Sequence, residues 1–258
     1  MSAAQEHERV VQAQFGPRAQ AYVESAVHAG GADLDRLEAL AQAATPRRAL
    51  DLGCGGGHVA YRLARHAAAV TACDLSADML AAVAATARAR GLIPIETVQA
   101  PAGRLPFEDA HFDFLGCRFS AHHWGDLDAG LREAHRVLQP GATAVFIDAV
   151  SPGTAMLDTH LQGVELLRDP SHVRDYTAGE WCAALARAGF SLRASQSWRL
   201  RLEFATWIAR MRTASAHVEA IRSLQRAASH ETRAYFAIEA DGSFMLDALL
   251  LETSAAAD

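Results

Sequence analysis

Alternating glycines and two aspartates form the part of the sequence best suited to bind a ligand. Gly53, Gly55 and Gly57 follow an apolar run that predicts a strand, and a helical stretch follows them. Glycines at such a turn let the backbone approach a ligand, and N-H groups at the start of the helix can bind it. Asp51 stands before this loop, and Asp74 ends the next apolar run. The arrangement predicts a nucleotide-type site at the carboxyl ends of two strands.

The spacing and the charges distinguish two kinds of nucleotide cofactor. A nicotinamide dinucleotide fold needs the pattern G-x-G-x-x-G, whose third glycine would stand where this chain has His58. Asp51 would repel a pyrophosphate but suits an ammonium group, directly or through water. Asp74 is placed to accept both hydroxyls of a ribose. The pattern therefore favours S-adenosylmethionine, which carries an ammonium, a sulfonium and a ribose; the alternative is that both aspartates only cap helices.

The elements that position these residues alternate between short apolar runs and helical stretches. Such alternation is typical of βαβ units on a parallel sheet. Ser76 is a predicted N-cap, and Gly91 is a predicted helix end. A helix over 131–138 should end at Pro140-Gly141. The expected strands are 49–52, 70–73, 95–99, 112–117, 143–148, 190–202 and 244–251.

The chain divides into four predicted segments. Residues 1–44 read as an N-terminal helical lid, 45–150 as the cofactor-binding core, 151–180 as an insertion over the active site, and 181–258 as the completion of the sheet with a helical cap. Thr177 with Glu180 three residues on is a capping box that opens a helix over 181–188, and helical stretches are expected from 205 to about 236.

Composition limits the partners. The 258 residues include 24 basic and 30 acidic side chains, for a net charge of -6, which argues against a nucleic-acid partner. The four cysteines are far apart, so the sequence predicts neither a metal site nor a disulfide framework. A charged N-terminus and the lack of a long apolar stretch predict a cytoplasmic protein that does not enter the membrane. The sequence does not decide between a monomer and a homodimer.

Several motifs together resemble class I S-adenosylmethionine-dependent methyltransferases of the ubiquinone/menaquinone-biosynthesis type (methyltransferase type 11). The resemblance covers roughly residues 45 to 150 and is carried by residues 49–59, 70–80, 105–107, 112–113 and 136–141. It implies an α/β fold with a Rossmann-like, seven-stranded mixed sheet of order 3-2-1-4-5-7-6, the last strand antiparallel, helices on both faces and a small helical lid. It also implies S-adenosylmethionine as cofactor and a small-molecule methyl acceptor as partner.

One departure from the family concerns the adenine site. Pro101 stands where relatives usually carry the acid that receives the adenine amino group. Adenine should then depend on the Ala102 backbone and on packing by Leu75 and Met79. The full set of expected cofactor-binding residues is Asp51, Gly53, Cys54, Gly55, Gly57, Asp74, Leu75, Met79, Ala102 and Cys117, although Cys54 and Cys117 suit plain packing as well.

Methyl transfer from a sulfonium is an in-line displacement, so the protein must align the reactants and remove a proton from an alcohol, phenol or activated carbon. His122 and His123 follow the fourth expected strand, and Asp148 ends the fifth. A histidine held by a carboxylate is a credible base near neutral pH. These three residues are the catalytic candidates. One histidine could instead cap a helix or contact the methionine part of the cofactor.

Four residues are candidates for substrate contact. Phe15 and Tyr22 lie in a segment that resembles the lid helix of relatives, where helix packing is the alternative. Arg168 and His172 in the insertion could bind a carboxylate or phosphate, where surface ion pairs are the alternative. Oxygen acceptors are slightly preferred over nitrogen and carbon. The rival hypotheses are a non-catalytic S-adenosylmethionine-binding protein and a quinone-type C-methyltransferase.

Overall fold

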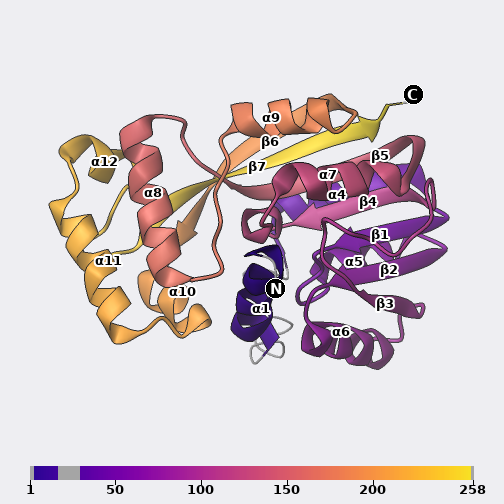
Figure 1. The fold of residues 1–258 in the computed structure, drawn as a ribbon, viewed down its shortest axis with the longest axis horizontal. Helices are drawn as coiled ribbons and strands as arrows, with labels where there is room; N and C mark the ends of the chain where they lie inside the picture. The colour runs from indigo at the N-terminus through magenta and orange to yellow at the C-terminus, as the bar shows by residue number, and fades with distance from the viewer. Residues whose placement is uncertain (1–2, 17–29, 257–258) are drawn as a thin grey trace.

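A seven-stranded mixed sheet forms the centre of the protein, which we describe from a computed structural model over residues 3–16 and 30–256 (Figure 1). The strand order is β3-β2-β1-β4-β5-β7-β6, as the resemblance predicted. Among the described strands, only β7 runs antiparallel to its neighbours. The strands are β1 (Arg48–Leu52), β2 (Ala69–Asp74), β3 (Ile95–Gln99), β4 (Phe112–Arg118), β5 (Leu138–Val150), β6 (Phe190–Leu202) and β7 (Phe244–Ala255).

Helices cover both faces of this sheet (Figure 1). On one face, Leu131 and Trp181 pack against Phe146; on the other, Leu37 and Val59 belong to a second buried cluster. Strands buried on both faces are nearly continuous apolar runs, which explains why the sequence pattern was readable. The helices are α1 (Ala3–Phe15), α4 (Ala32–Ala44), α5 (His58–Leu63), α6 (Ala77–Ala89), η2 (Ala121–His123, a 3-10 turn), α7 (Leu127–Arg136), α8 (Ala155–Arg168), α9 (Ala178–Arg187), α10 (Phe204–Met211), α11 (Ser215–Ala227) and α12 (His230–Tyr235).

Local capping explains several helix starts. The Ser76 side chain accepts from the Met79 N-H (3.3 Å) at the start of α6, as predicted. The predicted capping box is also present, because Thr177 and Glu180 each accept a hydrogen bond from the other's backbone N-H (3.1 and 2.7 Å). It opens α9 at Ala178.

Several predicted boundaries were wrong. Helix α7 begins at Leu127, four residues early, because Asp126 caps it through the Ala129 N-H (2.9 Å). Strand β5 begins at Leu138 and continues through Gly141, whose φ of 81° absorbs a register shift against β4. The last helical stretch is divided into α10, α11 and α12, and β7 continues four residues beyond the predicted end, to Ala255.

The C-terminal helices form a second, smaller core with α8 beyond the far ends of β6 and β7 (Figure 1). Leu161 of α8 is buried there with Trp207, Ile221, Phe236 and Phe244. Helix α8 therefore packs mainly against α11 and α12 rather than on the parallel strands. Over residues 3–16 and 30–256, no helix has both the length and the apolar character needed to cross a membrane.

Candidate active site

A cavity of about 750 Å³ lies at the carboxyl ends of β1, β2 and β4, between the glycine loop and α1. Ligands of open α/β sheets bind at this edge. Most of the predicted cofactor residues line it: Asp51, Gly53, Cys54, Gly55, Asp74, Leu75, Met79 and Ala102. The structure places Gly57 and Cys117 differently. Gly57 is the residue before α5, and Cys117 is buried within β4 (1% exposed).

The glycine loop bends in a way that side chains would prevent. Gly53, Gly55 and Gly57 have φ values of 70°, 47° and 79°, in the left-handed region that favours glycine. A Cβ atom on Gly53 would lie 1.9 Å from the Ser120 Oγ, which no packing can accept. The N-H groups of Gly53 and Cys54 donate to the Cys73 carbonyl (2.8 and 3.0 Å), so the turn is held against the end of β2.

The two predicted acids both face the cavity while accepting backbone hydrogen bonds. Asp51 Oδ2 accepts from the Ala60 N-H (2.8 Å), and burial raises the pKa of Asp51 to about 7. Asp74 accepts from the N-H groups of Gly55 (2.8 Å) and Ser76 (2.9 Å). Burial raises the pKa of Asp74, and these backbone donors partly oppose the rise. Helix capping and ligand contact are therefore compatible roles for both carboxylates.

The thiol of Cys54 lines the cavity in its neutral form. Burial, followed by the charge of Asp74, raises its pKa well above the ordinary value. A thiol is nucleophilic as the thiolate, so this environment disfavours a reactive cysteine. Loop packing explains Cys54, as the sequence had suggested.

The adenine end of the expected site is apolar. The residues that line the cavity there include Leu75, Met79, Pro101 and Ala102, and Arg104 also lines the cavity. Pro101 has no carboxylate, so this part of the wall can bind adenine only through apolar packing and backbone groups.

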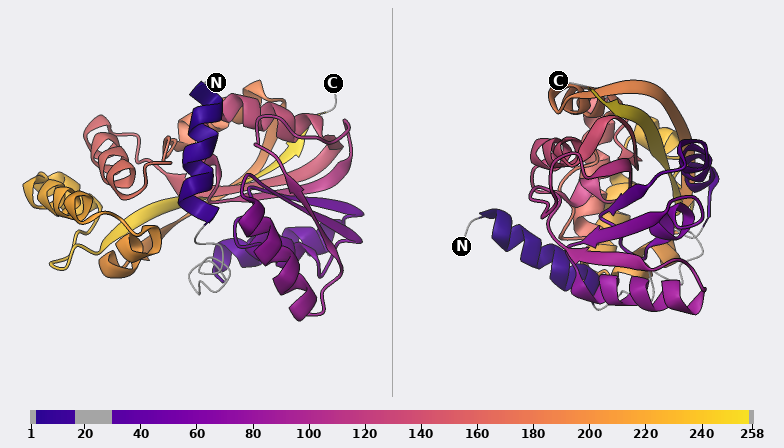
Figure 2. Two further views of the ribbon diagram at one scale, coloured as in Figure 1. Left: turned by 60° about the horizontal axis from the view of Figure 1, so that its bottom comes forward. Right: turned by 90° about the vertical axis from the view of Figure 1, so that its right-hand side faces the viewer.

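Helix α1 and helix α4 take different positions, although both belong to the segment predicted as a lid. Leu34 and Leu37 of α4 are buried in the core of the sheet. Helix α1 stands out from the body of the sheet (Figure 2). Its His7 and Phe15 contribute to the cavity wall. The Gln12 amide donates to the Leu75 carbonyl (3.1 Å), and the His7 ring is bonded to the His123 carbonyl (2.8 Å). Helix α1 thus bridges the two ends of the cavity.

The predicted catalytic residues lie together at η2 and β5. His122 Nδ1 lies 2.5 Å from Asp148 Oδ1, and the His122 N-H donates to Asp148 Oδ2 (3.2 Å). Burial alone lowers the pKa of His122, but the charge and hydrogen bond of Asp148 outweigh it and raise the pKa to about 9. At neutral pH this is an imidazolium-carboxylate pair.

His123 has the opposite character and, of the two histidines, is the one that lines the cavity. Burial and the charge of His122 lower the pKa of His123 below its ordinary value, so its ring is neutral at neutral pH. Its Nδ1 lies 3.2 Å from the Ser171 carbonyl oxygen. The Phe15 ring meets it edge-on at 4.9 Å, and the His122 ring centre is 4.1 Å away.

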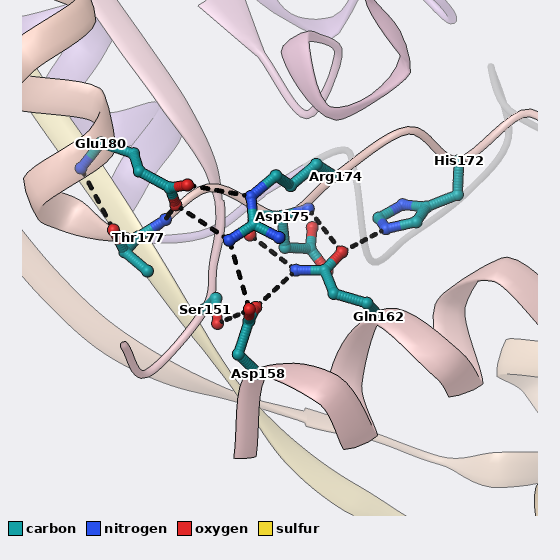
Figure 3. Close-up of polar contacts among 8 residues, drawn as sticks. All are labelled: Ser151, Asp158, Gln162, His172, Arg174, Asp175, Thr177 and Glu180. Carbon is teal, nitrogen blue, oxygen red and sulfur yellow. Dashed lines mark hydrogen bonds and ion pairs between the residues drawn. The ribbon is translucent and has the colours of Figure 1, made fainter. Parts of the chain in front are cut away.

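The insertion contributes less to the cavity than its charged residues suggested. His172 is bonded to Gln162 (2.9 Å), within a network that Figure 3 shows, and does not line the cavity. Arg168 also lies away from it, where it pairs with Glu165 (3.3 Å) and donates to the Trp207 carbonyl (3.2 Å). Tyr22, the remaining substrate candidate, lies outside the described residues.

Sequence reasoning missed several cavity residues that come from separate elements. Val11 on α1, Ala129 on α7 and Val173 in the insertion all line the cavity. The Val173 N-H donates to the His122 carbonyl (2.8 Å), which attaches the insertion to the histidines. No local pattern marks these residues, because their proximity depends on tertiary packing. Within the described ranges, no group of three or more His, Cys, Asp or Glu side chains could hold a metal ion.

Comparison with known proteins agrees with this geometry. Residues 50–146 match the family described as "Methyltransferase domain". The "Uncharacterized protein YafE" of Escherichia coli is 45% identical over 205 residues, spanning 80% of this chain and 99% of that protein. The "Uncharacterized methyltransferase YcgJ" of Bacillus subtilis is 30% identical over 243 residues, spanning 92% and 96%. The chain belongs to the S-adenosylmethionine-dependent methyltransferases.

Two further similarities refine this placement. The crystal structure of the Bacillus subtilis YcgJ protein superposes with a TM-score of 0.83 at 29% identity, covering 88% of this chain and 99% of that one. A demethylmenaquinone methyltransferase of Thermus thermophilus is 37% identical over 127 residues, 47% of this chain and 57% of that protein. The first similarity extends over most of the fold, whereas the second covers less than half of the chain.

S-adenosylmethionine is the cofactor of this family, and the cavity has the chemistry to hold it. When the cofactor is bound, Asp51 would offer a carboxylate to the ammonium, Asp74 would offer one to the ribose, and Leu75 and Met79 would pack on adenine. At Gly55 in the cavity wall, a Cβ would meet no atom within 4 Å, so the missing side chain leaves that space open to a ligand.

Proposed function

We propose that this chain methylates a small-molecule acceptor that gives up a proton, with oxygen slightly preferred over nitrogen or carbon as the methylated atom. One observation carries the proposal: the cavity that holds the glycine loop and Asp74 also has His123 in its wall. Cofactor and acceptor would then share one enclosed space, which in-line transfer requires.

The chain's own residues divide the work along the cavity. Asp51 holds the ammonium group of the cofactor's amino-acid portion, and Asp74 holds its ribose. Leu75 and Met79 pack on the adenine. S-adenosylmethionine supplies an electrophilic methyl group on its sulfonium. Helix α1 acts as the lid, because Phe15 covers the cavity next to His123 and limits the access of water.

The histidines and Asp148 support removal of the acceptor proton. The tight bond between His122 and Asp148 fixes η2 at the end of β4, and a neutral His123 stands beside the cavity. A neutral imidazole can accept a proton as the new bond forms. Acceptors that need no deprotonation would leave this arrangement without a use, which is why hydroxyl acceptors are preferred.

Two alternatives have specific support. The similarity to a demethylmenaquinone methyltransferase favours carbon methylation of a quinol-type acceptor, although it covers only 47% of this chain. Pro101 in the place of the usual adenine-binding acid favours a protein that binds the cofactor without turnover. The first alternative would give a C-methylated product, and the second would give no product.

Titration calorimetry and product analysis test the proposal together. We expect the folded protein to bind S-adenosylmethionine. Incubation with catechol, tyramine and 1,4-naphthohydroquinone as probe acceptors, followed by mass spectrometry, should give S-adenosylhomocysteine and an O-methylated product. An N-methylated or C-methylated product alone would replace the preference for oxygen, and absence of cofactor binding by the folded protein would refute the proposal. Asp128→Ala, a surface variant outside the cavity, serves as the control.

A further inference from the structure

His123 is joined to the loop after α8 by a short chain of hydrogen bonds. Asp169 Oδ1 accepts from the Ser171 hydroxyl (2.6 Å) and from the Ser171 N-H (2.9 Å). The Ser171 hydroxyl and carbonyl oxygens lie 3.3 and 3.2 Å from His123 Nδ1. Asp169 and Ser171 are both buried, at 1% and 0% exposure. A carboxylate, a hydroxyl and an imidazole therefore follow one another toward the cavity.

This chain fixes which nitrogen of His123 carries the proton. A carboxylate only accepts hydrogen bonds, so the Ser171 hydroxyl must point its hydrogen at Asp169. Only oxygen lone pairs then face His123 Nδ1, from the hydroxyl and from the carbonyl. Nδ1 must be the protonated nitrogen, and Nε2 keeps its lone pair. A base needs that lone pair.

The neighbouring His122 is a poor candidate for the same task. Its Nδ1 is committed to Asp148, and it does not line the cavity. Its pKa of about 9 keeps the ring protonated at neutral pH, which leaves no lone pair to accept a proton. Of the two adjacent histidines, His122 is thus a cation held by Asp148, and His123 is a neutral ring.

We propose that His123 Nε2 takes the acceptor proton, and that Ser171 and Asp169 are positioning residues that hold His123 in the Nδ1-H form. The inference rests on the proposed function and names the base within that site. In the step, the acceptor O-CH₃ bond forms as the S-CH₃ bond breaks. The electron pair of that bond goes to sulfur, and the O-H proton goes to Nε2. The resulting imidazolium donates Nδ1-H to Ser171, and the negative charge of Asp169 offsets its positive charge.

Charged groups from several elements act on His123, so its state depends on more than Asp169. The charge of His122 on η2 opposes protonation of His123, whereas Asp169 and Asp148 of β5 favour it. His7 of α1 contacts the His123 carbonyl, next to the same ring.

The loop that carries Asp169 and Ser171 is fastened on its other side (Figure 3). The Gln162 amide of α8 accepts from the Asp175 N-H (3.1 Å) and donates to the Asp175 carbonyl (2.8 Å). Gln162 also binds His172 and Asp158. Helix α8, which packs away from the cavity, thereby fixes the loop that orients the base. This gives the insertion a role in positioning rather than in direct contact with the acceptor.

Nuclear magnetic resonance of the ¹⁵N-histidine-labelled protein tests the inference without a known acceptor. Long-range ¹H-¹⁵N spectra at pH 7.5, with S-adenosylhomocysteine bound, should show His123 as the neutral Nδ1-H tautomer and His122 as doubly protonated. His122→Asn and His123→Asn assign the signals. A His123 protonated on Nε2, or a neutral His122, would overturn the inference.

Two variants of Asp169 separate positioning from simple stability. Asp169→Ala frees the Ser171 hydroxyl to donate to Nδ1 and should shift His123 toward the Nε2-H form. Asp169→Asn keeps an oxygen acceptor for Ser171 and should retain the Nδ1-H form. If the tautomer stays unchanged in folded Asp169→Ala, the positioning role is wrong; if this variant does not fold, loss of the Nδ1-H form in Asp169→Asn refutes it. His66→Asn, paired with Glu38 outside the cavity, is the control.

Binding and turnover keep the two proposals distinguishable. A folded protein that does not bind S-adenosylhomocysteine refutes the proposed function itself. A protein that binds it but shows the wrong tautomer refutes only the present inference. With a probe acceptor that the wild type methylates, His123→Asn should lower kcat by about 100-fold or more while the KM for S-adenosylmethionine stays unchanged. An unchanged kcat would contradict the role of His123.

Discussion

The two ends of the cavity are built in different ways. At the cofactor end, Asp51, Gly53 and Asp74 come from two consecutive strand-helix units, so their proximity follows from the local chain path. At the other end, Phe15, His123 and Val173 come from α1, η2 and the insertion. The cofactor end repeats a local motif, whereas the opposite end, where we propose that the acceptor binds, is assembled from distant segments. On this proposal, the acceptor end can change without changing the cofactor end.

The largest expected effect concerns the buried pair that anchors the acceptor end. Asp148→Asn should lower the free energy of unfolding by about 3 kcal/mol, because it leaves the charge or the ring of His122 buried without its partner. Urea denaturation measures this. The surface pair of Arg187 and Asp128 gives the control, since Arg187→Ala should cost at most about 1 kcal/mol.

The pH dependence of this pair has a definite sign. The folded pKa of His122, about 9, exceeds its ordinary value of 6.5. The stability that the pair contributes is therefore complete below about pH 6.5 and is lost as the pH rises through about 9. The difference between wild type and Asp148→Asn should shrink at pH 10. A difference that grows with pH would contradict the charge assignment.

The second prediction concerns the ribose contact at the cofactor end. Asp74→Ala should weaken binding of S-adenosylmethionine about 100-fold, because two hydrogen bonds to a carboxylate are removed. Calorimetry measures the change in Kd. Asp78, in the first turn of α6, is a nearby acid outside the cavity wall, and Asp78→Ala should bind normally. Equal affinity in wild type and Asp74→Ala would show that this carboxylate only caps the loop.

The third prediction uses the raised pKa of Asp51. We propose that the ionised carboxylate binds the cofactor ammonium, and burial raises the pKa of Asp51 to about 7. Affinity for S-adenosylmethionine should therefore rise about tenfold between pH 6 and pH 8. Asp51→Asn should remove that dependence. The control ligand 5′-methylthioadenosine, which lacks the ammonium, should bind the wild type equally at both pH values; a parallel rise would assign the effect to another group.

The smallest effect is expected at Arg168, a residue that the sequence suggested for substrate binding. Its ion pair with Glu165 and its place over the Trp207 ring (5.1 Å) give it a structural role. Arg168→Ala should leave the KM of the acceptor within about twofold and lower stability by about 1 kcal/mol. A larger rise in that KM would restore the assignment to substrate binding and weaken the contrast between the two ends.

The sequence predicted the sheet and the glycine loop because both depend on local patterns. Apolar strands and the left-handed turn at Gly53 are encoded in a few adjacent residues. Ser171 and Asp169 carry no such pattern, since their relation to His123 arises from a contact between segments 48 residues apart. The early start of α7 was missed although local signals marked it: Asp126 is an N-cap residue, and the buried Leu127, Leu131 and Ala134 recur at helical spacing. Long-range packing, rather than local preference, sets most of what else remained unpredicted.

A crystal structure with S-adenosylhomocysteine bound would test the central claim most directly. The account predicts that the ribose lies at Asp74, that the sulfur points toward the acceptor end, and that His123 Nε2 lies closer to the sulfur than any atom of the His122 ring. A sulfur that faces His122, with His123 turned away from the cavity, would contradict it.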